Sequence, residues 1–410
     1  MVKSWFLRVS NLGPGALITA AFIGPGTITT CSVAGASFGF ALLWGLVFSI
    51  VATLLLQEMA ARLGIISGSG LGEALRIHFS KGLGKIIAIT LVISAITIGN
   101  AAFETGNILG ATLGLESLTN SYGQFRTYWV ILIGLIAFFI LFAGNYKLIE
   151  KAMLALVILM SLTFISTALI TGPAPMQVLQ GMFVPSIPKG GLITLVGLIG
   201  TTVVPYNLFL YASTVQQRFK GSDALPAARL DMGIAIILGG FISMAVVITA
   251  AMAFYGSGQS PSHAGDLSRQ LEPLVGKLAP AFIGLGLFAA GISSAITAPL
   301  AAAYATMGVL GWENTLSSWR FRAVWMTILF AGMIFSLLGF RPVEAIVFAQ
   351  AANGILLPVI AVYLLWVMNS KKVMGMHTNG LVSNLFGGLV VLIALVLGIR
   401  SLLHVFGLLN

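Results

Sequence analysis

The chain has 410 residues, of which 58% are hydrophobic and 8% carry a charge, and its formal net charge is +10. A soluble globular protein normally carries about a quarter charged residues, so this composition excludes a soluble protein and indicates one that lies in a lipid bilayer. Cys31 is the only cysteine, which excludes a disulfide within the chain and a metal site built from cysteines.

Apolar runs of roughly twenty residues, the length that crosses hydrocarbon as a helix, recur along the whole chain and predict an all-α integral membrane protein with about eleven transmembrane helices. Lys3 and Arg8 precede the first run as in a signal peptide. No small-residue cleavage site interrupts that run, however, so we interpret it as a retained helix. The predicted spans are 12–36, 39–61, 84–109, 127–145, 149–171, 191–216, 229–255, 278–308, 322–340, 343–368 and 383–407.

The positive charges predict the orientation of these spans. With the N-terminus in the cytoplasm, fifteen Lys and Arg residues fall on the cytoplasmic side and six on the other side, as expected for short cytoplasmic loops. An odd number of spans then places the C-terminus outside. The net charge is therefore explained by topology and by attraction to anionic lipid rather than by nucleic-acid binding. We expect a multi-pass protein of the cell inner (cytoplasmic) membrane with no nucleic-acid partner.

Two of the long apolar segments are interrupted by similar breakers, Gly24-Pro25-Gly26-Thr27 in the first and Val204-Pro205-Tyr206-Asn207 in the sixth. Proline removes a backbone donor, so each break frees polar backbone groups in the bilayer, where they are tolerated only beside protein or a watery cavity. Paired breaks in two halves are typical of secondary transporters that hold their substrate near the midplane. Helices 1 and 6 are therefore predicted to be broken.

Spans one to five and six to ten form two sets of five that each open with a broken helix, which predicts an inverted repeat. We expect a single transmembrane domain over 1–410, with loops between the spans too short to fold alone. Its parts are a first repeat at 12–171, a second repeat at 191–368 and an additional helix at 383–407; the longest predicted loops are 110–126, 172–190 and 256–277.

Several segments share the sequence patterns of one known family. In them the chain resembles the Nramp (natural resistance-associated macrophage protein) metal transporters, which have a LeuT-like fold. The resemblance spans most of the chain and implies a secondary active transporter that moves a divalent metal cation by alternating access. The segments are Gly13-Pro14-Gly15, 38–44, 57–64, 289–294, Phe348-Ala349-Gln350 and Leu357-Pro358.

The chain departs from that family at the metal ligands. Family members read Asp-Pro-Gly-Asn at the first break, where Gly24 and Thr27 replace the two ligands, and Met-Pro-His-Asn at the second, where Val204 and Tyr206 stand. Tyr211 replaces a further histidine. Transition metals require donors of matching softness, so no metal ligand is assigned with the carboxylate, thioether and histidines missing. Two substrate classes stay open: a divalent metal cation, and a small polar or zwitterionic organic solute such as an amino acid or betaine.

Neutral oxygen-bearing groups remain around the two breaks, and they suit a hydrated cation or a small polar molecule. Threonine hydroxyls in membrane helices commonly bond to the preceding turn, and Gln350 and Asn353 are explained nearly as well by hydrogen bonds between helices. The expected substrate-binding residues are Gly24, Thr27, Thr201, Val204, Tyr206, Asn207, Gln350 and Asn353.

Glu104 is the one acidic residue in the middle of a predicted span, on a helical stripe with Asn100 and Asn107. The resemblance matches it to a third-helix acid associated with proton transfer in the family. Because removal from water raises the proton affinity of a carboxylate, we predict that Glu104 couples transport to protons, with a structural hydrogen-bond anchor as the alternative. Glu58 lies four residues before Arg62 at a helix end, which predicts a local ion pair.

The sequence does not indicate an enzyme. Its four histidines form no ligand cluster, and the glycines between Gly64 and Gly72 lack a phosphate-binding pattern. We therefore expect no catalytic residues and no cofactor, with the transported solute or cation, protons and the lipid bilayer as partners. A signalling protein on a transport scaffold is a third possibility, which the absence of a long soluble tail argues against.

Overall fold

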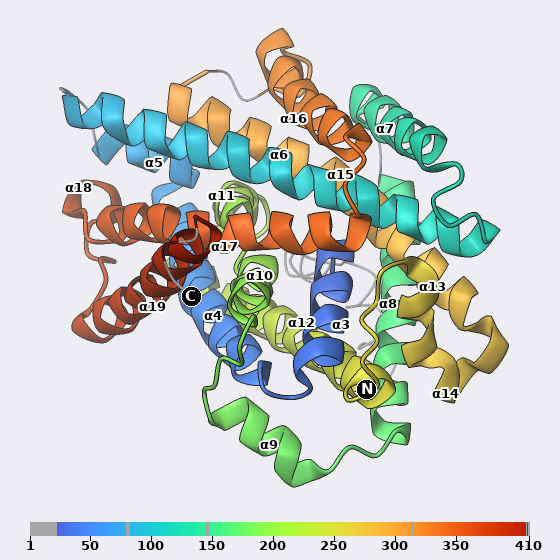
Figure 1. The fold of residues 1–410 in the computed structure, drawn as a ribbon. Helices are drawn as coiled ribbons and strands as arrows, with labels where there is room; N and C mark the ends of the chain where they lie inside the picture. Colours follow the sequence, from blue (N-terminus) through green and yellow to red (C-terminus); the bar gives the residue numbers. More distant parts are fainter. Residues whose placement is uncertain (1–22, 79–82, 145–146, 313–314, 407, 409–410) are drawn as a thin grey trace, which may run out of the picture.

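The computed structural model describes residues 23–78, 83–144, 147–312, 315–406 and 408, and all regular structure in these ranges is helical. Figure 1 shows long helices that cross one another in a single bundle, with short helices at its margins. The helices are α3 (Pro25–Phe38), α4 (Leu43–Ser67), α5 (Leu71–His78), α6 (Leu83–Thr119), α7 (Arg126–Ala143), α8 (Lys147–Ile170), α9 (Pro175–Phe183), α10 (Leu192–Thr202), α11 (Pro205–Thr214), α12 (Leu225–Phe254), α13 (Ala264–Ser268), α14 (Glu272–Val275), α15 (Ala279–Leu310), α16 (Trp319–Leu337), α17 (Pro342–Met368), α18 (Lys371–Met374) and α19 (Leu381–Val405).

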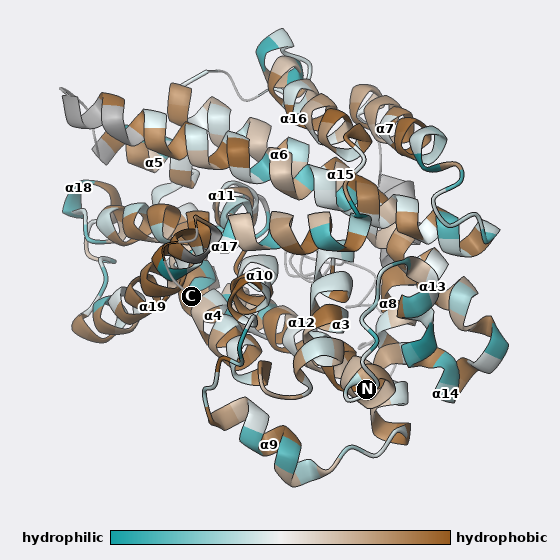
Figure 2. Ribbon diagram, in the orientation of Figure 1, coloured by the Kyte–Doolittle hydropathy of each residue, from teal (hydrophilic) through white to brown (hydrophobic). Residues whose placement is uncertain are grey.

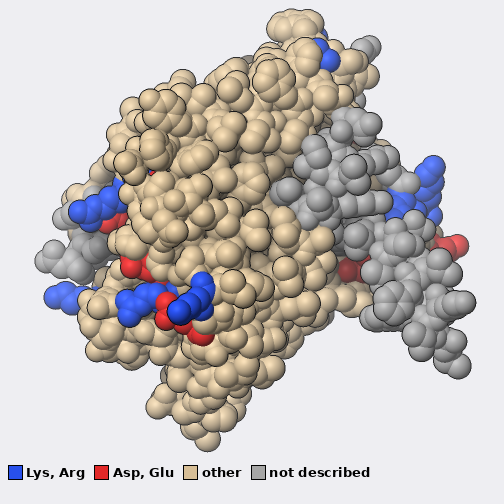
Figure 3. All heavy atoms as spheres, turned by 90° about the vertical axis from the view of Figure 1, so that its right-hand side faces the viewer, with Lys and Arg blue, Asp and Glu red and all other residues tan. Residues whose placement is uncertain are grey.

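The apolar helices agree with the predicted spans. Within the described ranges, nine helical segments are long and apolar enough to cross a membrane, and 155–170 is a shorter apolar helix. The first eleven residues of the first predicted span, 12–36, lie outside the described residues, and α3 contains most of the rest. Figure 2 shows apolar residues along the long helices and hydrophilic ones concentrated near the connections, and Figure 3 shows a face on which charged side chains form only a few groups.

Part of the predicted loop 110–126 was wrong, because α6 continues to Thr119. Glycines there serve close packing rather than a turn. A side chain at Gly110 would overlap Pro25 of α3, and one at Gly114 would overlap the backbone of α15 at Phe288. In a sequence, a glycine suggests the end of a helix, but inside a helix it also lets another helix approach closely. The predicted loops 172–190 and 256–277 likewise contain the short helices α9, α13 and α14.

Helices that correspond in the two predicted repeats lie against each other in four of the five pairs. The pairs in contact are α3 with α10, α4 with α12, α6 with α15 and α7 with α16. Contacts between counterparts are expected where two halves are related by an approximate two-fold axis. The pairing supports the five-plus-five arrangement, while the proposed limits of the repeats remain predictions.

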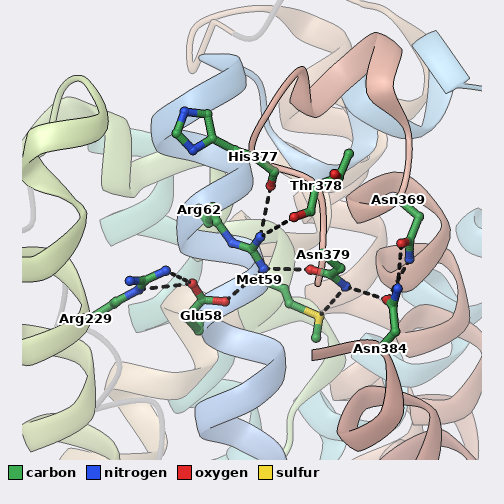
Figure 4. A network of polar contacts seen from close by, with 9 residues as sticks. All are labelled: Glu58, Met59, Arg62, Arg229, Asn369, His377, Thr378, Asn379 and Asn384. Carbon is green, nitrogen blue, oxygen red and sulfur yellow. Dashed lines mark hydrogen bonds and ion pairs between the residues drawn. The ribbon is translucent and has the colours of Figure 1, made fainter. Parts of the chain in front are cut away.

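One end of α4 is held by a network of polar contacts (Figure 4). Arg62 forms the predicted ion pair with Glu58 at 3.2 Å, and Glu58 also pairs with Arg229 of α12 at 2.6 Å. Arg62 further donates to the backbone oxygen of His377 at 2.9 Å and to Oδ1 of Asn379 at 2.6 Å, between α18 and α19. The network thus ties α4 to α12 and to the C-terminal helices.

Candidate functional site

The second predicted break is present between α10 and α11. Helix α10 ends at Thr202 and α11 begins at Pro205, with Val204 in an extended conformation between them. Pro205 has no N–H to continue the first helix, and the next turn starts with the Asn207 amide, which donates to the Val204 oxygen at 3.1 Å. The sixth membrane segment is therefore discontinuous, as predicted.

The described half of the first break has the same form. Gly24 is extended, with φ −78° and ψ 169°, and α3 begins directly after it at Pro25. Its carbonyl accepts hydrogen bonds from the amides of Thr27 and Ile28 at 3.1 and 3.3 Å. A helix therefore starts at this break with its N-terminal end toward Gly24. The preceding half of this segment lies outside the described residues.

The two breaks meet through a pair of hydroxyl groups. Oγ1 of Thr27, in the first turn of α3, lies 2.8 Å from Oγ1 of Thr201, near the end of α10. Both side chains are buried. These threonines are 174 positions apart in the sequence, but the fold brings their hydroxyls within hydrogen-bond distance. The two breaks therefore lie at one site.

Gln350 of α17 reaches into this site through the space left by two glycines. A side chain at Gly26 of α3 would overlap the Gln350 amide, and one at Gly106 of α6 would lie 3.5 Å from its nitrogen. Gln350 is fully buried, and neither its amide oxygen nor its amide nitrogen has a hydrogen-bond partner. A buried amide without partners costs free energy, so this side chain is suited to contact a bound solute or water.

Three other predicted residues are also buried with unused polar atoms. The hydroxyl of Tyr206, the amide oxygen of Asn207 and the amide nitrogen of Asn353 have no partner. Asn353 lies one turn from Gln350 on α17, beside Gly99 of α6. Tyr206 and Asn207 lie at the second break, and Asn353 lies where α17 contacts α6. Each of them has a polar atom that is free to form a hydrogen bond.

Val204 contributes an apolar surface to the break. It forms a buried cluster with Phe103, Tyr206, Ala298 and Ala301, and the rings of Phe103 and Tyr206 meet edge to face with centroids 5.2 Å apart. At this position the chain offers a solute only backbone groups, because the valine side chain has no donor atom. Tyr211, one turn further along α11 from Asn207, is buried as well and its hydroxyl lacks a partner.

Glu104 is fully buried, but its described contacts are not with the breaks. Its Oε2 accepts from the Asn107 amide at 3.2 Å, and its Oε1 has no partner. Gly332 of α16 packs directly against its side chain, since a Cβ there would lie 2.5 Å from Cγ of Glu104. The preceding residue, Phe103, contacts Tyr206. Glu104 therefore lies next to the site, turned toward α16.

The described residues contain no group of three His, Cys, Asp or Glu side chains that could hold a metal ion. The side chains described at the breaks carry neutral hydroxyl and amide groups, next to backbone carbonyls. One neighbour was missed in the sequence: Ser294 of α15, whose hydroxyl faces Gly24. Its sequence signal was its place in the segment 289–294, which resembles the family, but no binding role was assigned to it.

Comparison with known proteins agrees with this architecture. The profile of the family described as natural resistance-associated macrophage protein-like matches residues 15–404. A divalent metal cation transporter MntH from Verminephrobacter eiseniae is 31% identical, covering 90% of this chain and 83% of the relative. The MntH transporter of Klebsiella pneumoniae strain ATCC 700721 is 29% identical, covering 91% and 89%.

Solved structures show the same fold. A manganese transporter from Eremococcus coleocola aligns with a TM-score of 0.77 at 25% identity, covering 97% of this chain and 87% of that chain. MHP1, a nucleobase-cation-symport-1 family transporter, aligns with a TM-score of 0.57 at 16% identity, which shows likeness of fold alone. The fold is thus that of the LeuT-like transporters, and the chain belongs to the Nramp family of multi-pass membrane proteins.

Proposed function

We propose that this protein is a secondary active transporter that moves a divalent metal cation across the membrane by alternating access. Its relatives named as divalent metal cation transporters, and the related manganese transporter, support this substrate class. The observation that carries the proposal in this chain is the meeting of the two breaks, where the Thr27–Thr201 hydroxyl contact and the Gln350 amide lie together. This is the place where transporters of this architecture hold a solute.

The chemistry of the site favours a cation that keeps part of its water shell. A bare divalent ion is poorly compensated in a bilayer without a carboxylate, and none of the predicted binding residues is acidic. Water molecules bound to a cation are strong hydrogen-bond donors and need acceptors. The oxygens of Gln350, Asn207 and Tyr206 are buried and lack donors. Waters of a hydrated ion would supply them.

A small zwitterionic solute is the second class that the sequence leaves open. The α3 N-terminus would attract a carboxylate, but the family relationship does not favour this substrate. We therefore retain it as an outcome of the uptake experiment below rather than as a second proposal.

Proton coupling through Glu104 is a separate part of the proposal. Its support is a fully buried carboxyl whose Oε1 has no partner, beside the Phe103–Tyr206 contact. We also propose the cytoplasmic membrane as the location, with the N-terminus in the cytoplasm and the C-terminus outside, because of the Lys and Arg distribution.

Uptake into proteoliposomes tests the substrate. We expect saturable uptake of Mn²⁺ or Mg²⁺, and a loss of about tenfold in uptake efficiency for Thr201→Val, equivalent to about 1.4 kcal/mol. Thr167→Val is the matched control, since Thr167 is buried but bonds within α8 to the Thr163 oxygen at 2.8 Å. Uptake of amino acids or betaine without any divalent metal uptake would overturn the metal proposal.

A further inference from the structure

Helix α15 lies along both breaks, although the sequence placed no binding residue in it. Ser294, Ala298 and Ala301 follow one another at spacings of four and three and so share one face of the helix. Ala298 and Ala301 pack against Val204 and Tyr206 at the second break. One turn earlier, a Cβ at Gly24 of the first break would lie 3.3 Å from Oγ of Ser294. Ser294 is the one polar side chain among these three.

The Ser294 hydroxyl is buried but unused. The residue is 2% exposed, and its side chain makes no hydrogen bond with any described residue, whereas most other buried serines in the described residues bond to a neighbouring group. Ser243, for example, bonds to the Gly239 oxygen one turn back at 3.0 Å. Three residues after Ser294, the Thr297 hydroxyl also turns back, to the Ser293 oxygen at 3.1 Å. The Ser294 hydroxyl instead points to Gly24 at the first break, where it keeps its hydrogen-bonding capacity for another group.

No hydrogen bond joins the Ser294 hydroxyl to the described backbone at Gly24 and Pro25. Gly24 has no side chain, and Pro25 has no N–H. The Gly24 carbonyl accepts from the Thr27 and Ile28 amides inside α3. The Ser294 hydroxyl therefore faces the start of α3 at the first break without being bonded to it.

We propose that Ser294 is a further substrate-contacting residue, whose hydroxyl oxygen accepts a hydrogen bond from water bound to the transported divalent cation. Gly24 then acts through its size, because the absent side chain leaves room for that water. The inference rests on the proposed function. It adds α15 to the segments that contribute residues to the proposed site, which are α3, α10–α11 and α17. Together with Thr27 and Thr201, the hydroxyls would contact the ion's waters from both breaks.

Kinetics of Mn²⁺ uptake in proteoliposomes test this role. We expect Ser294→Ala to raise KM by about fivefold, with maximal uptake changed by less than about twofold, since one hydrogen bond to bound water is lost. Ser294→Thr keeps the hydroxyl and should restore most of the affinity. The matched control Ser243→Ala removes a buried hydroxyl that is satisfied within α12, and its KM should equal that of the unaltered protein.

Gly24→Ala provides a second measurement that leaves all polar groups in place. The added methyl group would narrow the space in front of Ser294, so KM for Mn²⁺ should rise in this variant too. Unchanged KM in both Ser294→Ala and Gly24→Ala, with normal uptake by the unaltered protein, would overturn the role of Ser294 while leaving the proposed function intact. Absence of saturable divalent cation uptake by the unaltered protein would overturn both.

Discussion

Two polar regions of this molecule differ in whether their buried polar atoms have hydrogen-bond partners. At the end of α4, Arg62 bonds to Glu58, His377 and Asn379, and Glu58 bonds in turn to Arg229 (Figure 4). Only Nε of Arg62 has no partner in this network. At the breaks, both atoms of the Gln350 amide lack a partner. A buried polar atom that has no hydrogen bond costs about 1–3 kcal/mol of stability, which is more than a typical hydrogen bond contributes. The paired groups link helices, and the unpaired groups at the breaks are the ones that the proposed function assigns to the substrate.

The largest effect on stability is expected from the Arg62 network. Arg62→Met should lower the free energy of unfolding by about 3 kcal/mol. It removes one of the two partners of the Glu58 carboxylate and the hydrogen bonds to His377, Thr378 and Asn379. Thermal unfolding in detergent measures this. Arg341→Met is the control, since the Arg341–Glu344 pair is mostly exposed and exposed pairs contribute little. Equal shifts for both variants would contradict the contrast between the two regions.

Gly26→Ala should destabilise the protein by about 1–3 kcal/mol through overpacking. The new methyl group would overlap the Gln350 amide. The double variant Gly26→Ala with Gln350→Ala removes the overlap and should recover the melting temperature of Gln350→Ala alone, while metal uptake stays low. If the double variant melts as early as Gly26→Ala, Gln350 does not fill the space beside α3.

Glu104→Gln should change stability by about 1 kcal/mol or less, because Oε1 has no partner to lose and the Asn107 bond to the other oxygen can be kept. The transport phenotype is expected to be larger: metal-driven proton flux should disappear while the fold is retained. A pH-sensitive dye inside proteoliposomes reports this flux. Persistent acidification on metal addition would remove Glu104 from the coupling mechanism.

The smallest effect on stability is expected for Tyr206→Phe. The hydroxyl has no partner, and the ring contact with Phe103 survives the change, so the melting temperature should stay the same or rise slightly. The affinity for Mn²⁺ should fall if the hydroxyl contacts the substrate. A marked loss of stability instead would show that the hydroxyl has a structural partner and does not belong to the unpaired region.

Local patterns predicted much of the architecture, while the binding role of the site residues stays a prediction. The apolar runs identified the membrane helices, and Val204-Pro205 located the second break. The sequence also indicated Gln350 as a site residue, and the structure places its amide against Gly26. Glycines were ambiguous, however, because an apolar stretch with Gly110 and Gly114 is compatible with both a loop and a tightly packed helix.

What the sequence by itself determined is therefore the set of helices, the two breaks and the loss of charged ligands, since these depend on local composition and on the chemistry of proline. Only the tertiary structure decided that Thr27 meets Thr201, that Glu104 faces α16 and that Ser294 faces Gly24. Such contacts depend on how helices cross and rotate against each other, and packing of side chains from distant segments sets that rotation.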